Sequence, residues 1–187
     1  MRPLIAASLA LAIAGVAHAA APPAWILDKS ASSLRFTSSM AGESFGGVFR
    51  RWDATIRFDP ANLAASSVTA DIDVASATTA NADRDQALPT ASFFDAPAHP
   101  HATFVARGFT VVGPGRYAAA GILTLRGVAK PVTLPFTLAI AGAQAKMVGA
   151  VAINRLAFGV GQGEWQATDA IPAAVTVSVA ITARRAP

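Results

Sequence analysis

The sequence predicts an all-β fold, an antiparallel barrel of about eight strands. Three stretches, residues 68–74, 132–140 and 175–182, alternate apolar side chains with mostly polar or small ones. Successive side chains of a strand point to opposite faces, so this period of two indicates a sheet with one apolar face. Long strands joined by turns rather than by helices are typical of a closed antiparallel barrel. An inner wall of aliphatic and aromatic side chains predicts a container for an apolar molecule.

The amino terminus has the pattern of a cleaved secretory signal peptide, which we expect to occupy residues 1–19. Arg2 supplies a positive start, residues 4–16 form an apolar run, and Ala17-His18-Ala19 is a small-x-small cleavage site. The run is shorter than the roughly 20 residues that span a bilayer, and a retained anchor is the alternative. We therefore expect residues 20–187 to form a single periplasmic domain.

The chain is apolar and carries few charges. Hydrophobic residues make up 53% of the 187 residues, and the formal net charge is +4. A nucleic-acid binder clusters its basic residues, whereas here only Arg50-Arg51 and Arg184-Arg185 are adjacent. We expect no nucleic-acid partner and a solvated surface, with a weak attraction to anionic lipid head groups as the alternative. The sequence has no cysteine, which excludes disulfides and thiolate metal sites.

The first half of the domain reads as a meander. The packed domain begins at residues 25–27, and strands are expected at residues 33–40, 46–59 and 67–75. Asp59-Pro60-Ala61-Asn62 predicts a turn, because Pro fixes its own backbone angle and Asp and Asn bond to nearby amides.

The stretch from residue 78 to residue 100 breaks the strand pattern. A short helix is expected over residues 81–88, with Thr79 or Asn81 as its cap and Pro89 as its end. Residues 90–95 predict a second helical turn, so the helical insertion covers about residues 79–95. Two interpretations stay open: a fixed plug at one barrel end, or a gate that contacts the ligand.

The second half returns to long strands, expected at residues 101–112, 116–125, 128–141, 145–154 and 173–184. Eight strands enclose an interior that side chains can just fill or that can hold one small ligand. Small residues at inward positions favour a cavity over a solid core; they are Ala70, Ala102, Ala106, Ala119, Gly121 and Gly149.

Five groups of short motifs follow one another along the chain. They are Trp25-x-x-Asp28; Phe49 followed by Phe58-Asp59-Pro60; the run Arg84-Asp85-x-x-Leu88, Phe93-Phe94-Asp95 and Pro100-x-x-Thr103-Phe104; Gly121-x-Leu123-Thr124-Leu125-x-Gly127-Val128-x-Lys130-Pro131-Val132; and Arg155-x-x-Phe158-Gly159. In this order they resemble the YceI-like family of bacterial secreted lipid-binding proteins, over residues 25–184. Two positions depart from the family's usual pattern. Ala157 stands where an acidic residue is common, so no carboxylate role is carried over, and Ala54 stands where a glycine is common.

The resemblance implies a lipocalin-like barrel that binds a long-chain amphiphile, such as a polyisoprenoid, an isoprenoid quinone, or a fatty acid or amide. The expected function is that of a periplasmic carrier that sequesters or ferries this lipid. The expected partners are the lipid ligand and, transiently, a membrane, with the protein a monomer or a homodimer. No cofactor is expected apart from the bound lipid.

The candidate ligand-binding residues form two groups. Residues expected to line the cavity are Phe36, Trp52, Ile56, Phe93, Phe94, Phe104, Leu123, Phe136, Phe158 and Trp165. Residues expected to hold an anionic head group at the barrel mouth are Arg84, Arg126, Lys130 and Arg155, because a guanidinium suits phosphate or carboxylate. Core packing for the first group and structural ion pairs for the second are the alternatives.

The usual catalytic constellations are missing from the sequence. His99 and His101 would share a face of a strand, but no third metal ligand follows at a recognisable spacing. Asp83 and Asp85 fit a solvated helix start. We expect neither an enzyme nor a metal site. Two rival functions stay open: an eight-stranded outer-membrane barrel, because alternation does not say which face is apolar, and an enzyme acting on a lipid held in the cavity.

Overall fold

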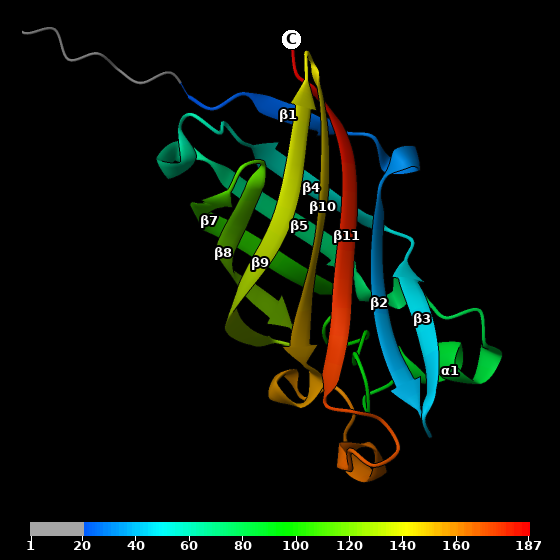
Figure 1. The fold of residues 1–187 in the computed structure, drawn as a ribbon. Helices are drawn as coiled ribbons and strands as arrows, with labels where there is room; N and C mark the ends of the chain where they lie inside the picture. Colours follow the sequence, from blue (N-terminus) through cyan, green and yellow to red (C-terminus); the bar gives the residue numbers. More distant parts are fainter. Residues whose placement is uncertain (1–20) are drawn as a thin grey trace, which may run out of the picture.

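The computed structural model describes residues 21–187. The expected signal peptide, residues 1–19, lies outside the described residues. The described chain forms one antiparallel sheet that closes into a barrel (Figure 1). The predicted all-β fold, an eight-stranded barrel with a short helical insertion, is confirmed.

Eight strands close the barrel in the order β1, β4, β5, β7, β8, β9, β10 and β11, and β11 pairs back onto β1. Their bounds are Ala24–Leu27 (β1), Trp52–Arg57 (β4), Ser67–Asp73 (β5), His101–Gly113 (β7), Arg116–Leu125 (β8), Val128–Ala141 (β9), Gln144–Asn154 (β10) and Ala174–Arg185 (β11). Three further strands, β2 (Ser33–Met40), β3 (Glu43–Phe49) and β6 (Ala77–Thr78), continue the wall beyond β1, β4 and β5.

Three walls of the barrel are thus each made of two strands in sequence. The interruptions are η1 (Lys29–Ala31), residues 50–51, and η3 (Val74–Ser76). Asp28 caps η1 because its side chain accepts hydrogen bonds from the backbone amides of Ser30 and Ala31. The backbone amides of Arg50 and Arg51 donate to the carbonyl and the hydroxyl of Ser76, at 3.2 and 3.0 Å. The single strand predicted over residues 46–59 is therefore two strands, because these amides bond to Ser76 instead of to a neighbouring strand.

The apolar side chains of the alternating strands face the barrel interior. The inward residues of β9 and β11 are Val132, Leu134, Phe136, Leu138, Ile140, Val175, Val177, Val179 and Ile181. Residues between them, such as Thr133 and Thr176, are exposed on the outside. The apolar face that the sequence predicted is the inner face of the barrel.

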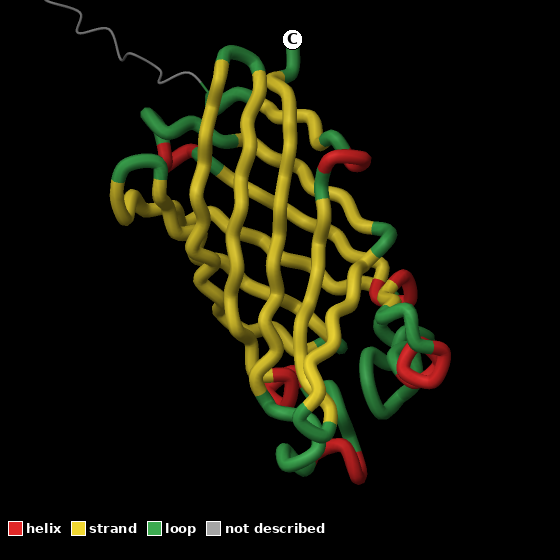
Figure 2. The backbone as a smooth tube through the Cα atoms, turned by 45° about the vertical axis from the view of Figure 1, so that its right-hand side comes forward, coloured by secondary structure: helices red, strands yellow, loops and turns green. Residues whose placement is uncertain are grey.

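Short helices lie near both ends of the barrel, and the helical insertion and the two short helices that follow β10 lie toward the lower end (Figure 2). The insertion predicted at about residues 79–95 contains α1 (Ala82–Ala87), and the Asn81 side chain caps it by accepting from the Arg84 amide at 3.0 Å. Residues 90–95 form hydrogen-bonded turns in place of the predicted helical turn. The remaining short helices are η2 (Leu63–Ala65), η4 (Arg155–Phe158) and η5 (Gly163–Gln166). A search of the described helices finds none with the length and apolar character needed to cross a membrane.

Candidate functional site

The barrel encloses a cavity of about 680 Å³ whose walls are almost entirely apolar. This volume falls within the range of roughly 300–1,000 Å³ that is usual for small-molecule sites. The inner faces of all eight barrel strands contribute to the walls, and β2, β3 and the insertion complete one end. The site can therefore take up a molecule with a long apolar part.

Nine of the ten predicted cavity residues line this volume. They are Phe36, Trp52, Ile56, Phe93, Phe94, Phe104, Leu123, Phe136 and Trp165. Phe158 does not line it: this residue is 3% exposed and packs in the core beneath the insertion, in a cluster with Phe94 and Val160. Phe158 is the last residue of η4, in the connection after β10, and it is buried in that core.

Sequence reasoning missed several aromatic rings of the cavity, namely Trp25, Phe45, Phe49, Phe58 and Phe109. Phe109 is the most instructive case. It is five residues from Phe104, so strict alternation places the two rings on opposite faces. A β-bulge between Ala106 and Gly108 shifts the register and returns Phe109 to the inner face. The irregularity is set by pairing with β8, which alternation within β7 does not reveal.

At one end the apolar lining gives way to polar groups. The polar and charged residues among the lining are Ser38, Thr79, Asn81, Asp83, Arg84 and Arg155. Four of them belong to residues 79–84, immediately before and within α1. Ser38 lies opposite Phe45 in the β2–β3 register, and the Arg84 guanidinium lies 4.7 Å from the centre of the Phe45 ring. The end of β2 and the start of α1 thus meet at this part of the cavity.

Two of these groups have geometry that suits a polar ligand head. The Arg84 Nε donates to the Thr79 hydroxyl at 3.2 Å, which holds the guanidinium at the cavity wall. The Ser38 hydroxyl is buried and has no hydrogen-bond partner among the described residues. A buried hydroxyl without a partner is costly, and an oxygen of a bound molecule would satisfy it.

Arg155 borders the same end but serves the fold. It is 4% exposed, and its guanidinium donates to four backbone carbonyls, those of Val160, Ala167, Ile171 and Pro172, at 2.8–3.4 Å. Burial lowers the pKa of the Arg155 guanidinium, although arginine stays charged in proteins. The side chain therefore ties the loop between η4 and β11 together across the bottom of the barrel.

The other two predicted head-group residues do not line the cavity. Arg126 lies in the two-residue turn between β8 and β9, with a φ of +49°, and its Nη2 donates to the carbonyl of Ala91 at 2.6 Å. Lys130 is exposed on β9. Arg126 thus connects the turn to the insertion, and Arg84 is the predicted cation best placed to meet a ligand.

Asp85 fixes α1 to the barrel. Its carboxylate accepts from the hydroxyls of Thr78 and Thr79, at 2.5 and 2.7 Å, and from the Thr79 amide at 2.6 Å. These donors, the Thr78 hydroxyl above all, hold the pKa of the Asp85 carboxyl below its usual value, against an opposing effect of burial. Asp85 lies in the first turn of α1, as expected, and its carboxylate is in addition engaged by β6 and the residue after it.

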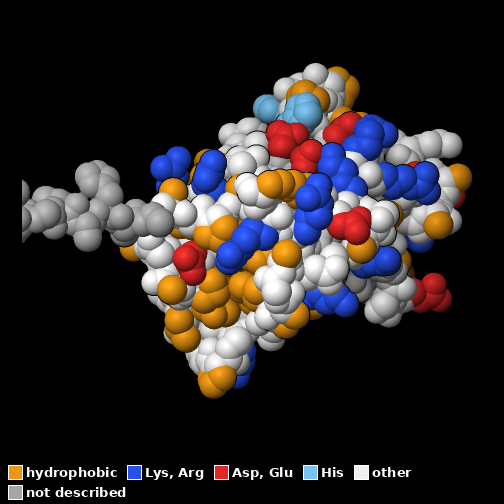
Figure 3. Space-filling model, turned by 90° about the horizontal axis from the view of Figure 1, so that it is seen from above, with side chains coloured by type: hydrophobic (Ala, Val, Ile, Leu, Met, Phe, Trp, Pro, Cys, Tyr) orange, Lys and Arg blue, Asp and Glu red, His pale blue; other side chains and the backbone are white. Residues whose placement is uncertain are grey.

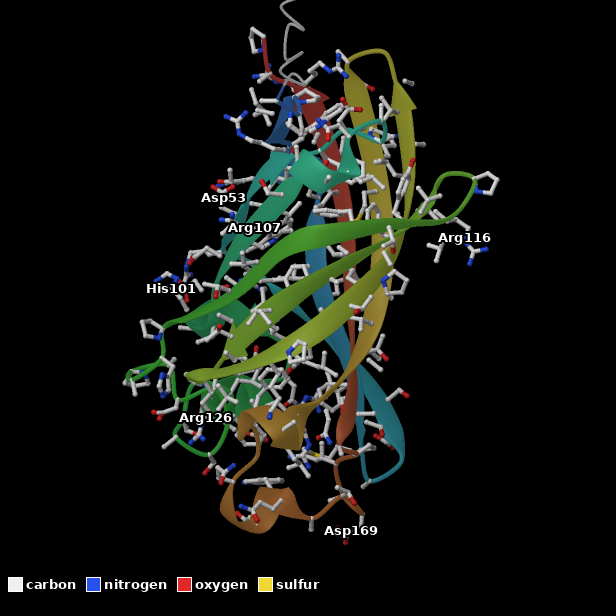
Figure 4. The ribbon with its side chains drawn as sticks, turned by 90° about the vertical axis from the view of Figure 1, so that its left-hand side faces the viewer. Asp53, His101, Arg107, Arg116, Arg126 and Asp169 are labelled. Atoms are coloured by element: carbon white, nitrogen blue, oxygen red, sulfur yellow. The ribbon has the colours of Figure 1, made fainter. Side chains whose placement is uncertain are left out.

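An exposed ion pair and an exposed histidine–aspartate contact lie on the outside of the barrel beside β4, β5 and β7. Arg51 bonds to Asp73 at 2.7 Å, and His101 Nδ1 lies 2.8 Å from Asp71. Figure 4 shows Asp53, His101 and Arg107 on the outside of the barrel. Within residues 21–187, no group of three or more His, Cys, Asp or Glu side chains could hold a metal ion.

Comparison with known proteins finds similarity over most of the chain. Residues 25–183 match the YceI-like domain family. A UPF0312 protein of Vibrio cholerae is 34% identical over 134 residues, which cover 70% of each chain. The crystal structure of BcnA from Burkholderia cenocepacia superposes with a TM-score of 0.81 at 33% identity, over 83% of this chain and 98% of that one. A polyisoprenoid-binding domain from Saccharophagus degradans shares the fold, with a TM-score of 0.69 at 16% identity over 88% of this chain and 99% of that one.

Proposed function

We propose that this chain, which belongs to the YceI-like family, is a periplasmic carrier that holds a long-chain amphiphile inside its barrel. The observation that carries the proposal is the apolar cavity of about 680 Å³ with its single polar end. The signal-peptide pattern of residues 1–19 supports the periplasmic location. The barrel shared with the polyisoprenoid-binding domain of Saccharophagus degradans supports an isoprenoid chain as the cargo.

The polar end gives the ligand an orientation. The apolar tail lies along β9, β10 and β11, whose inward side chains are aliphatic or aromatic. The head lies beside α1, where Arg84 and the Ser38 hydroxyl offer donors. An acceptor-rich head, such as a phosphate, a carboxylate or a quinone carbonyl, suits these donors because a guanidinium bonds strongly to oxygen acceptors.

The energetics favour carriage over storage. Burying a methylene contributes about 0.8 kcal/mol, so a chain of about 16 carbons gains roughly 13 kcal/mol on leaving water. Part of this gain is lost to ordering the tail. In a bilayer the tail is already out of water, so transfer between a membrane and the barrel is close to neutral in free energy. The carrier then needs no energy source to load at one membrane and unload at another.

The direction in which the apolar side chains face argues against the alternative of an outer-membrane barrel. A membrane-spanning barrel presents an apolar band to the lipid and a polar interior. Here the inner wall is apolar, and Arg51, Asp53, Thr55 and Arg57 lie exposed on the outside of β4 or beside it. We also infer binding rather than catalysis, since the Asp85 carboxylate is engaged by Thr78 and Thr79 instead of facing a substrate.

The test is native mass spectrometry of protein purified from the periplasm without detergent, followed by organic extraction. We expect a stoichiometric isoprenoid or fatty-chain adduct. Val177→Phe, which adds bulk to the inner wall of β11, should lower adduct occupancy and shorten the preferred tail. Thr176→Phe places the same ring on the outer face and is the matched control.

Two results would contradict the carrier. The first is wild-type protein that stays free of ligand after incubation with lipid vesicles. The second is equal occupancy in the Val177→Phe and Thr176→Phe variants, since it would place the ligand outside the barrel.

A further inference from the structure

Acidic residues are absent from one half of the barrel wall. Between Asp95 and Glu164 the sequence contains no Asp or Glu, but six basic residues: Arg107, Arg116, Arg126, Lys130, Lys146 and Arg155. Four of them, Arg107, Arg116, Lys130 and Lys146, lie on β7, β8, β9 and β10, which are neighbours in the sheet. Arg126 lies in the turn between β8 and β9, and Arg155 is buried in η4. The charged residues are scattered along the sequence, but in the folded barrel every Asp and Glu side chain lies outside these four strands. The negative charge is therefore distributed unevenly around the barrel.

The same four strands carry most of the exposed large apolar side chains. Among the described residues six such side chains are exposed, and four of them lie on β7–β10 outside the cavity lining: Val111, Val112, Ile122 and Val148. A fifth, Ile140, is on β9 but lines the cavity. The valines are the most exposed, at 60%, 57% and 59% for Val111, Val112 and Val148. Seen from above, one end of the molecule also shows hydrophobic side chains gathered at the lower left and most of the acidic ones in the upper part (Figure 3). A face that is both basic and apolar differs from an ordinary solvated surface.

The tip of the β7–β8 hairpin projects from this face. Beyond Ala106, β7 pairs with β8 alone, because its pairing with β5 ends there. A second register shift, between Val111 and Gly113, turns both Val111 and Val112 to solvent. Figure 4 shows the hairpin extending from the barrel with Arg116 close to its tip. The projecting part, residues 107–116, is an apolar tip between two arginines.

The apolar and basic side chains also adjoin one another along the wall. Arg116 on β8 is paired with Thr137 on β9, and Thr137 with Val148 on β10. Directly opposed residues of neighbouring strands share a face. Arg116 and Val148 therefore flank Thr137 on the outside of the barrel, which extends the hairpin tip into a continuous surface.

We propose that the outer face of β7–β10, led by residues 107–116, docks the protein on an anionic lipid bilayer. The valines enter the boundary between head groups and acyl chains while the arginines meet anionic head groups, as in other surface-bound segments. A second copy of this chain is a poorer occupant, because two basic faces repel. Residues 107–113 have no neighbouring strand on the β5 side of β7, so the tip projects from the barrel. A projecting tip suits a deformable bilayer better than a rigid protein surface.

The experiment is vesicle co-sedimentation, with equimolar phosphatidylglycerol and phosphatidylcholine compared with phosphatidylcholine alone. Wild type and variants are all purified after processing in the cell, so that every protein compared has the same amino terminus. Wild type should bind the anionic vesicles, and binding should weaken as salt is added. Arg107→Gln with Arg116→Gln should weaken binding by about fivefold for each arginine, and Val111→Ser with Val112→Ser by about thirtyfold in total.

Matched controls lie on the other face. Arg35→Gln with Arg57→Gln removes the same charge from β2 and β4, and Ile26→Ser removes the exposed apolar residue outside β7–β10. Both should bind like wild type. Three results would overturn the proposed docking surface. They are no binding of wild type to anionic vesicles, equal binding of wild type to neutral vesicles, and a loss of binding in the control variants equal to that in the test variants. Because the test does not depend on cargo, it is independent of whether the cavity holds a lipid.

Discussion

Gly47 is the position at which a single added methyl group should disturb the cavity wall most directly. It is buried on β3 opposite Phe36 of β2. A Cβ there would lie 2.1 Å from Phe36 Cζ and 2.5 Å from Cε1. Carbon atoms in contact rest about 3.5–4.0 Å apart, so the ring has to retreat by about 1.5 Å. Phe36 lines the cavity, and the space available to the ring is the cavity itself.

Gly47→Ala should lower the free energy of unfolding by about 1–3 kcal/mol, the usual cost of overpacking. The displaced ring should also weaken binding of a long-chain ligand. The assay is urea unfolding followed by circular dichroism, together with the adduct measurement by native mass spectrometry. For a chain of this size each kcal/mol corresponds to about 2–4 °C in Tm.

Gly46→Ala is the control, because it makes the same change one residue away. Gly46 is exposed, and the nearest atom to its Cβ is the Phe36 carbonyl oxygen at 3.8 Å. Replacing this glycine should be neutral or should stabilise by about 0.4–1 kcal/mol through the unfolded chain. Adding Phe36→Leu to Gly47→Ala should recover part of the lost free energy of unfolding. Unfolding free energies of the two alanine variants within about 0.5 kcal/mol of each other would refute the reasoning.

Three further changes test the fold around the site. Gly161→Ala would bring a Cβ to 1.9 Å from Arg155 Nη1 at a φ of +87°, and urea unfolding should show a loss of about 2–4 kcal/mol. Trp25→Phe removes the hydrogen bond of 2.9 Å to the Phe58 carbonyl, and thermal unfolding should show a loss of about 1–3 kcal/mol. The lowered pKa of Asp85 means that its carboxylate stabilises the fold above about pH 4 and that this contribution is lost as the pH falls further. Asp85→Asn should therefore flatten the acid side of the Tm–pH curve measured by thermal melts.

The long second-half strands could be predicted from sequence because local signals agree there. The strands expected at residues 116–125 and 128–141 have the observed bounds. Apolar alternation sets each strand, and the Arg126-Gly127 turn between them has positive φ at both residues, as a tight hairpin needs. Six of the nine expected residues that line the cavity lie on strands, where parity along the strand decides which way a side chain points.

The remaining features depend on partners distant in sequence. The break at residues 50–51 is made by hydrogen bonds to Ser76, and the inward turn of Phe109 by a bulge against β8. Arg155 was expected to meet a head group, yet its donors go to four loop carbonyls of residues 160–172. In each case the decisive group lies on another segment, and periodicity within one segment carries no information about it.

The two proposals together set a limit on how tightly the protein can hold a membrane. Two arginines near an anionic surface contribute about 2 kcal/mol, and burial of two half-exposed valines adds about 1 kcal/mol each. A total near 4 kcal/mol corresponds to a dissociation constant of about 1 mM. Docking of this strength brings the barrel to the bilayer and lets it leave again. Since exchange of the tail between bilayer and barrel is nearly neutral, neither step traps the carrier. The direction of net transfer then follows the concentration of the amphiphile in the two membranes.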